Sequence, residues 1–360
     1  MATHRRLLCD QQRVWMIVLL EQTVDVSLLE ELDLLAEKRP RCLLCVHRAC
    51  RVRQGRDAPG RELKGFRISR MTYSIVARDP DTGELGVAVQ SHYFQVGPVV
   101  PWGLAGVAAV ATQSLVNVSF GPLGMELMRL GCTASQALDA VLATDPDREA
   151  RQCAMVDGTG SVAAHTGSRC IAEAGHRVGD GYSVQANLME RPTVWGAMAS
   201  SFESASGSLP ERMLEALDAA EAEGGDIRGR QSAAMLVLRG KPSGRSWEDR
   251  VIDLRVEDHP EPVTELRRLL RYRRAYQSAA AGDVAGHRGA LEIAPEVTQL
   301  RFFAGLALAG AGEWEEALGL LRQAVAEEPR WEETLRRLVP AGRVKPELAA
   351  EVEARLRARS

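Results

Sequence analysis

The sequence predicts an α+β fold in which two stacked β-sheets carry helices on their outer faces, followed by an all-helical tail. Three observations lead to this prediction. From residue 72 the chain opens with two strand-like segments around a dense turn. Further strand-like segments then alternate with two pairs of predicted helices. Beyond His259 the composition changes to alanine, leucine, arginine and glutamate at a helical period.

The first element is a β-hairpin. The segment TYSIVARD at residues 72–79 is rich in β-branched and aromatic residues, and LGVAVQSH at 85–92 is again strand-like. Between them, DPDTGE is dense in turn-forming residues. Because only this turn separates the two segments, we expect them to pair as neighbouring antiparallel strands.

The remaining elements follow from the same signals. Small residues at 105–113 indicate a strand, and the helix that begins after Thr133 has that residue as its N-cap. The glycines of GHRVGDG at 175–181 lack the context of a dinucleotide loop and predict a surface turn. The other predicted elements are helices at 121–131, 133–144, 192–203 and 209–223, a second hairpin at 151–166, and strands at 182–187, 232–240 and 250–258. About eight strands around two helix pairs fit two stacked sheets with helices on each outer face.

Composition and charge exclude several classes of function. The net charge is -3 and the pI is near 6.2, without a sustained basic block, so neither a nucleic-acid partner nor an anionic membrane partner is expected. The longest apolar run near the start, residues 14–20, is too short for a membrane span or a typical signal sequence. We therefore expect a cytoplasmic protein without a membrane segment.

The distribution of charge divides the chain into three parts. Lys and Arg outnumber Asp and Glu by 14 to 9 in residues 1–70, and are outnumbered by 15 to 24 in residues 71–258. In residues 259–360 the counts are 16 and 15. Together with the change to helical period, these shifts predict an N-terminal extension at 1–70, a domain at 71–262 and a helical domain at 263–360.

The N-terminal extension contains a candidate metal pattern, CLLCVHRAC, with Cys42, Cys45, His47 and Cys50. Thiolate and imidazole are ligands that zinc prefers, but structural zinc sites normally bring two separated ligand pairs together. Here the second pair is crowded onto the first. The alternative is that residues 1–70 are a non-native or disordered extension, and we predict no metal and no other cofactor.

The start of the mature chain is a second expectation. Arginine outnumbers lysine 41 to 4, a bias typical of GC-rich genes, in which a reading frame often stays open upstream of its true start. Met71 is therefore the expected initiator, and it is commonly removed before a residue as small as Thr72. A terminal Thr72 has a hydroxyl nucleophile and an α-amine that can accept a proton at neutral pH, since its pKa is about 7.7 to 8.0.

A set of sequence blocks resembles one known family. The blocks are MTYSIVARDPDTGELGVAVQS at 71–91, VGPVVPWGLAGVAAVATQSLVNVSFGPLG at 96–124, AAHTG at 163–167, GYSVQANLM at 181–189 and GGDIRGRQSAA at 224–234. They resemble the domain of unknown function 1028 (DUF1028) within the N-terminal nucleophile (Ntn) hydrolase superfamily, over residues 71 to about 262. The resemblance implies a four-layer αββα sandwich with Thr72 at the open end of one sheet. By superfamily analogy it also implies hydrolysis of an amide bond.

Several residues are candidate partners of Thr72. Asn187 ends the strand at 182–187 and is either an oxyanion donor or a cap of the following helix. Ser91 and His92 end the second strand of the hairpin and are candidate substrate-binding residues, although relatives more often carry a basic residue at the position of His92. Two further pocket residues are predicted after the strand at 105–113, namely Gln113 and Asn117.

The glycine-rich segment GGDIRGRQS supplies the last candidates, Asp226, Arg228 and Ser232. Arg228 either pairs with a substrate carboxylate in bidentate fashion or holds its own loop by pairing with Asp226. His165 and His176 are candidates for a serine triad, but the chain has no Gly-x-Ser-x-Gly elbow. The proteasome branch of the superfamily uses a lysine near its nucleophile, and the matching strand here has none.

The helical tail resembles a tetratricopeptide repeat (TPR). Ala317, Leu321, Ala324 and Pro329 lie at offsets 0, 4, 7 and 12, and a weaker copy falls 34 residues earlier, at Ala290. The array is too short for an independent solenoid, so we expect it to pack on the preceding domain or on a second subunit. These small and leucine positions are interpreted as core, with peptide binding as the alternative.

Two functions of different classes remain. The first is a hydrolase of an amide or related bond in a small molecule, with Thr72 as nucleophile and Asn187 at the oxyanion. The second is a non-catalytic scaffold that binds a partner protein, or a second copy of itself, through residues 263–360. The choice depends on whether Thr72 has a free α-amine.

Overall fold

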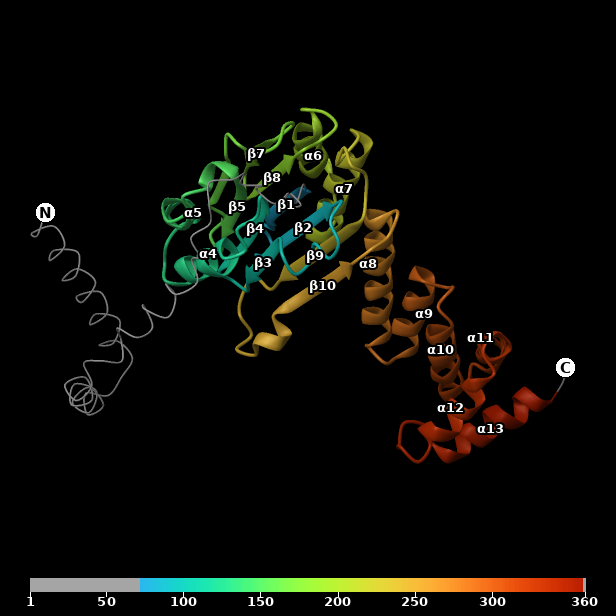
Figure 1. Cartoon of the computed structure of the whole chain (residues 1–360). Coiled ribbons are helices and arrows are strands. Elements are labelled where there is room, and N and C mark those ends of the chain that lie inside the picture. The colour runs from blue at the N-terminus through green and yellow to red at the C-terminus, as the bar shows by residue number, and fades with distance from the viewer. Residues whose placement is uncertain (1–71, 359–360) are drawn as a thin grey trace, which may run out of the picture. The chain divides into compact units, whose positions relative to one another are not determined.

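The computed structural model describes residues 72–358, whose strands form two antiparallel sheets. One sheet has the strand order β10-β9-β2-β1-β8-β7 and the other β3-β4-β5-β6 (Figure 1). The strands are β1 (Thr72–Arg78), β2 (Leu85–Ser91), β3 (Pro101–Leu104), β4 (Ala108–Ser114), β5 (Arg151–Asp157), β6 (Val162–Thr166), β7 (Gly175–Gly179), β8 (Tyr182–Asn187), β9 (Ser232–Leu238) and β10 (Arg250–Val256). The predicted α+β class is confirmed.

Some helices pack on these strands and the others form the C-terminal region. They are α4 (Phe120–Arg129), α5 (Ala134–Ala143), α6 (Val194–Ser204), α7 (Leu209–Ala222), α8 (Pro262–Ala279), α9 (Val284–Ile293), α10 (Thr298–Ala311), α11 (Trp314–Glu327), α12 (Arg330–Leu338) and α13 (Pro346–Arg357). The predicted cap of α5 is confirmed, because the Thr133 hydroxyl accepts a hydrogen bond from the Gln136 N–H and the Gln136 side chain accepts one from the Thr133 N–H.

The hairpin at the start of the described chain is confirmed. β1 and β2 pair from Thr72 opposite Ser91 to Arg78 opposite Leu85. In the turn between them, the Asp79 carboxylate accepts hydrogen bonds from the backbone N–H groups of Asp81 and Thr82, at 3.1 and 2.8 Å. This local bonding directs β2 back along β1. The hairpin therefore places Thr72, at the start of β1, beside Ser91, at the end of β2.

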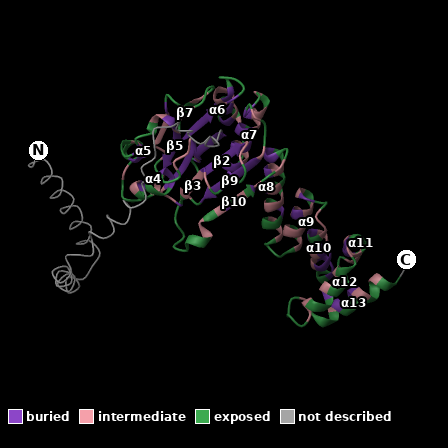
Figure 2. Ribbon diagram, viewed as in Figure 1, coloured by how far each residue is buried: buried purple, intermediate pink, exposed green. Residues whose placement is uncertain are grey.

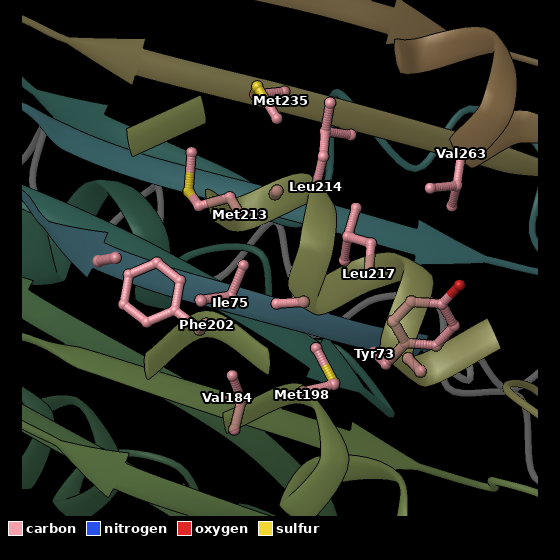
Figure 3. Packing of buried hydrophobic residues seen from close by; sticks show 14 of the residues in the cluster. Tyr73, Ile75, Val184, Met198, Phe202, Met213, Leu214, Leu217, Met235 and Val263 are labelled. Atoms are coloured by element: carbon pink, nitrogen blue, oxygen red, sulfur yellow. The ribbon is translucent and has the colours of Figure 1, made fainter. Parts of the chain in front are cut away.

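Alternation along β1 distributes its side chains over two hydrophobic clusters. Tyr73, Ile75 and Ala77 pack with α6, α7 and α8 (Figure 3). Val76 points the other way and packs in a cluster drawn from both sheets. A third cluster joins β4 and β5 to α4 and α5. Figure 2 shows that the strands in the middle of this region are buried.

Two edge strands differ from the sequence-based prediction. The predicted turn at 175–181 contains β7, which pairs with β8, and β3 was not predicted. β7 is glycine-rich at both ends and has three exposed residues at its centre, so it carries no alternation of apolar and polar residues. Its extended conformation comes from backbone pairing with β8, which local propensity does not report.

The C-terminal helical region is present as expected. The predicted core positions Ala317, Leu321 and Ala324 are buried, and Phe302 stacks on Trp331 at 4.6 Å between ring centroids. A Cβ on Gly305 would lie 2.6 Å from the Leu321 side chain, so a close helix contact requires glycine there. Helix α8 packs its first turns against the six-stranded sheet. Within residues 72–358, no helix has both the length and the apolar character needed to cross a bilayer.

Candidate active site

One end of the space between the two sheets is polar, although the rest is apolar. We call this group the inter-sheet polar cluster; all its members are buried, and they are Thr72, Ser74, Ser91, Gln113, Gln152, Ser183, Gln185 and Asn187. Further along the same faces, Val76, Val87 and Ala154 form apolar contacts instead. Polar side chains buried this deeply require hydrogen-bond partners. The cluster is therefore a bonded network at one end of the stack.

Thr72 is the first described residue and begins β1. Its hydroxyl donates to the Ser91 hydroxyl at 3.1 Å, and its carbonyl oxygen accepts from Gln113 at 3.1 Å and Asn187 at 3.2 Å. In the intact chain its nitrogen is a peptide nitrogen bonded to Met71, and Thr72 is fully buried. A peptide nitrogen cannot take up a proton at neutral pH, whereas an α-amine can.

Gln152 connects the two sheets. Its Nε2 donates to the carbonyl oxygens of Ala186 and Gly175, at 2.8 and 3.1 Å, and to the Thr166 hydroxyl at 2.9 Å. Carbonyl oxygens only accept hydrogen bonds, so they determine which end of this amide is nitrogen. Its Oε1 is thereby directed at Gln113 and Asn187, which donate to it.

The same reasoning orients the other amides. Gln113 Nε2 donates to the carbonyl oxygens of Thr72 and Gln185, so its Oε1 accepts from the Ser74 hydroxyl at 2.6 Å. Ser74 accepts in turn from Gln185 Nε2 at 2.6 Å. Backbone carbonyls therefore set the direction of every hydrogen bond along this path.

Asn187 lies directly opposite Thr72 in the β1–β8 register. Its Nδ2 donates to the Thr72 carbonyl and to Gln152 Oε1, at 3.2 and 2.9 Å. Its Oδ1 is buried and has no hydrogen-bond partner within the described part of the chain. The donor end of this amide is thus occupied and the acceptor end is free.

The inter-sheet polar cluster contains only hydroxyl and amide side chains, so none of its members titrates near neutral pH. A hydrogen-bonded path leads from Gln152 through Thr166 to His176, whose Nδ1 lies 2.8 Å from the Thr166 hydroxyl. Burial, and secondarily the charge of His165, lowers the pKa of His176 and favours its neutral form. The cluster therefore contains hydroxyl groups without a side-chain base among its own members.

Two strands that end in the cluster finish with strained backbone. Ser114, directly after Gln113, has φ +68°, and Leu188, directly after Asn187, has φ +52°. Such values are uncommon for residues with a Cβ and cost about 1–3 kcal/mol. Both strained residues lie where the chain turns away from the cluster.

Comparison with known proteins identifies the family. A family model described as "Family of unknown function (DUF1028)" matches residues 72–266. The chain belongs to the DUF1028 family. A crystal structure of a DUF1028 protein from Silicibacter pomeroyi is similar, with 32% sequence identity and a TM-score of 0.51, covering 58% of this chain and 86% of that chain. No curated protein matches the chain.

The structure of this DUF1028 member brings part of the predicted site together. Thr72, Ser91, Gln113 and Asn187 meet in the inter-sheet polar cluster, from β1, β2, β4 and β8. Their contacts arise from strand ends that lie at the same end of both sheets. Four of the predicted site residues therefore form one bonded group.

The other predicted residues hold loops. Arg228 donates from Nε and Nη2 to the Asp226 carboxylate at 3.1 and 2.7 Å, which favours the loop-holding alternative over a bond to substrate. The His92 N–H donates to the same carboxylate at 3.1 Å. Ser232 donates to the Tyr93 carbonyl and accepts from the Val96 N–H.

Asn117 lies outside the cluster, where it supports a buried ion pair. Its Nδ2 donates to Asp145 at 2.8 Å, and Arg151 Nε donates to the same carboxylate at 2.9 Å. The bond from Arg151, followed by those from Asn117 and the Asp147 N–H, outweighs burial and lowers the pKa of Asp145 to about 2. Asn117 therefore bonds the loop after β4 to Asp145.

This pKa shift predicts how stability depends on pH. The Asp145 pKa is lower in the folded state, so its stabilisation is present above pH 3.8 and lost as pH falls toward 2. An Asp145→Asn variant is expected to lower the free energy of unfolding by about 2 kcal/mol at pH 7, with the difference shrinking between pH 4 and 2. Urea unfolding at several pH values measures this; a difference that stays constant down to pH 2 contradicts it. Asp147→Asn, at an exposed carboxylate, is the control.

Sequence reasoning missed Ser74, Gln152 and Gln185, which carry most bonds of the cluster. A signal was present in YSVQAN, where Ser183, Gln185 and Asn187 alternate at the period of one strand face. Three polar residues on one face of an otherwise apolar strand indicate a buried polar surface. Gln152 stood alone in its strand and gave no such signal.

Other candidates for chemistry lie elsewhere. His165 Nε2 bonds to the Arg148 carbonyl at 3.0 Å and His176 to Thr166, so neither contacts a serine nucleophile through these bonds. Among residues 72–358, no group of His, Cys, Asp and Glu has the arrangement of a metal site. Cys42, Cys45, His47 and Cys50, like Met71, lie outside the described residues.

Proposed function

We propose that this DUF1028 protein is an Ntn-type amidohydrolase in which Thr72 is the nucleophile and its α-amine is the base. The observation that carries the proposal is the position of Thr72, which begins a central strand inside a buried, electrically neutral polar cluster. The packing of helices and facing sheets supports assignment to the four-layer αββα sandwich of the Ntn hydrolases. Since the cluster lacks a side-chain base, the α-amine is the group that can activate the hydroxyl.

The proposed reaction has two steps. Thr72 Oγ1 bonds to the carbonyl carbon of the amide while the α-amine takes the hydroxyl proton. The C–N bond then breaks as the ammonium returns that proton to the leaving nitrogen, and an ester remains on Thr72. A water molecule attacks the ester and gives its proton to the α-amine. The ester C–O bond breaks, the proton returns to Oγ1, and a carboxylic acid is released.

Asn187 has two possible parts in this reaction. As an oxyanion donor, its Nδ2 must leave the Thr72 carbonyl to which it donates at 3.2 Å. Its Oδ1 has no hydrogen-bond partner among residues 72–358 and belongs to the residue directly opposite Thr72. We therefore assign the Oδ1 to the α-ammonium of Thr72, which it orients as an acceptor. The predicted oxyanion role then falls to backbone N–H groups.

The proposal requires a free α-amine, so the first experiment determines the N-terminus. We expect protein made from the full gene to have an intact mass and a terminal peptide that begin at Thr72. Periodate cleaves a 1,2-amino alcohol, so unfolded protein with terminal Thr72 is expected to be oxidised, whereas a Thr72→Val variant is not. Protein that keeps residues 1–70 and resists periodate contradicts the proposal.

A scaffold function is the second candidate, and one observation favours it. The TPR-like tail holds a cavity of about 770 Å³ whose lining includes Phe303, Trp314, Arg343 and Lys345. A cavity whose lining combines apolar and aromatic side chains with charges of both signs suits a partner protein or a second copy of the chain. Deletion of residues 280–360, which retains α8, is expected to abolish such binding and to leave the Thr72 site intact, since α8 packs on the sheet.

A further inference from the structure

Large apolar side chains are exposed on the loops at the Thr72 end of the sheets. We call these residues the apolar rim: Phe94, Val118, Ile171 and Ile227, with exposed fractions of 53%, 37%, 37% and 55%. Phe94 follows the end of β2, Val118 follows β4, Ile171 lies between β6 and β7, and Ile227 precedes β9. At this end of the sheets, the strand termini next to these loops lie beside Thr72 or beside the residues bonded to it.

Backbone hydrogen bonds tie these loops together around the strand ends. The Leu188 N–H donates to the Ile171 carbonyl at 3.0 Å, and the Ile227 N–H donates to the Leu188 carbonyl at 3.3 Å. The His92 N–H donates to the carboxylate of Asp226, the residue before Ile227. This bond holds the loop that carries Phe94 on the same side. The strained residue Leu188 therefore lies between Ile171 and Ile227. It also directly follows Asn187 of the inter-sheet polar cluster.

Two arginines close to these loops are paired with buried carboxylates. Arg228 forms an ion pair with Asp226, whose side chain is fully buried. Arg151 forms one with Asp145 and also donates to the Leu115 carbonyl, on the loop that leads to Val118. Because both arginines are already paired, neither is left to balance an ionised group of a substrate. The inter-sheet polar cluster offers no charge either, since its side chains are hydroxyls and amides.

The arrangement differs from that of a protein interface. Protein interfaces have an apolar centre and a polar rim, whereas here exposed apolar side chains lie on the loops next to a buried polar cluster. A small-molecule pocket has the second arrangement, with apolar walls around a few placed polar groups. The rim is therefore better suited to the substituents of a small molecule than to a second protein surface.

We infer that the Thr72 site takes an uncharged amide with an apolar acyl group, which the apolar rim holds while the polar cluster faces the amide bond. This inference rests on the proposed function, because it concerns the substrate of the same site. It names a chemical class: N-acyl amides with aliphatic or aromatic acyl groups and no ionised substituent.

The test measures binding of matched coumarin amides to Thr72→Ala protein that begins at residue 72, by fluorescence titration. Hexanoyl amide is expected to bind about 15-fold more tightly than butanoyl amide, since each buried methylene contributes about 4-fold. Adipoyl amide has the same chain length as hexanoyl but a terminal carboxylate, and is expected to bind more weakly than hexanoyl. Equal affinities for the butanoyl and hexanoyl amides, or tighter binding of the adipoyl amide, overturn the inference.

Variants of the rim provide the second arm. Ile227→Ser is expected to weaken binding of the hexanoyl amide by about 10-fold. Phe94→Ser is expected to act in the same direction and replaces it if Ile227→Ser does not fold. Trp247→Ser is the matched control, because Trp247 is 76% exposed on the β9–β10 loop at the opposite end of the sheet. Its affinity is expected to match that of the parent protein.

The remaining outcomes separate this inference from the proposed function. If Ile227→Ser changes the oligomeric mass and leaves amide affinity unchanged, the apolar rim is a subunit contact and the inference fails. If the apolar amides bind as expected but protein with terminal Thr72 does not hydrolyse them, the substrate-binding inference stands and the hydrolase proposal fails.

Discussion

Replacement of Thr72 by alanine is expected to lower the rate of amide hydrolysis by about 10³-fold or more, in protein whose chain begins at residue 72. The Thr72 hydroxyl is the proposed nucleophile. The Ser74 and Ser183 hydroxyls donate to amides of the inter-sheet polar cluster, and the Ser91 hydroxyl accepts from Thr72 itself. The measurement is kcat and KM for an amide that the unmodified protein cleaves. Thr72→Ser keeps a hydroxyl beside the α-amine and is the matched control, expected to retain activity.

The pH profile of the same reaction tests the base. Activity is expected to rise with pH as the α-amine loses its proton, near its ordinary pKa of about 7.7 to 8.0. Asn187→Asp places a carboxylate beside the ammonium, so the rise is expected to move to higher pH. An oxyanion role for Asn187 instead predicts a lower kcat without movement of the profile. Hydrolysis by Thr72→Ala at the parental rate contradicts the nucleophile assignment outright.

Replacement of Gln152 by leucine is expected to lower the free energy of unfolding by about 4 kcal/mol. Gln152 donates to two buried carbonyl oxygens of the opposite sheet and accepts from Gln113 and Asn187. Leucine fills a similar volume but makes none of these bonds, so the amide nitrogens of Gln113 and Asn187 keep only their bonds to backbone carbonyls. Each unpaired buried polar group costs about 1–3 kcal/mol, and partial rearrangement recovers some of the total.

The same substitution at Gln90 is the matched control, with the opposite expected result. Gln90 is as buried as Gln152, but neither its Nε2 nor its Oε1 has a hydrogen-bond partner in the described structure. It lies opposite Tyr73 and Ala233, whose side chains belong to the apolar cluster under α7 and α8. Leucine removes an uncompensated amide, so Gln90→Leu is expected to be neutral or to stabilise by up to about 2 kcal/mol.

Urea unfolding of the two variants under identical conditions measures the contrast, as a shift in midpoint at a constant slope. Equal losses for both variants show that volume, and not hydrogen bonding, decides the outcome. A large loss at Gln90 alone shows that its amide has a partner that the described contacts omit.

Much of the fold follows from local sequence. The turn at residues 79–84, the cap at Thr133 and the strand at the start of the hairpin are each predicted from a few neighbouring residues, and each is present in the structure. The edge strand β7 was not predicted, because its conformation depends on pairing with β8. Local patterns report propensity, and edge strands of low propensity are decided by their neighbours.

Only part of the candidate site was predicted from the sequence. Thr72 and Asn187 were identified from the sequence, and they do meet. Gln152 was missed, and Arg228 was left open between a substrate carboxylate and Asp226. Arg228 and Asp226 are only two residues apart in sequence. Their bidentate bond was nevertheless decided by the folded loop, in which the Asp226 carboxylate is buried beside the guanidinium.

The sequence by itself determined most of the strands, the turn after β1 and the cap at Thr133, since these depend on residues near one another. The tertiary structure decided which polar groups share bonds: Ser74 meets Gln113 across 39 residues and Gln185 across 111. Those meetings depend on strand register and on the stacking of two sheets. A shift of one residue in register turns every side chain to the opposite face, so composition and spacing alone do not place the inter-sheet polar cluster around Thr72.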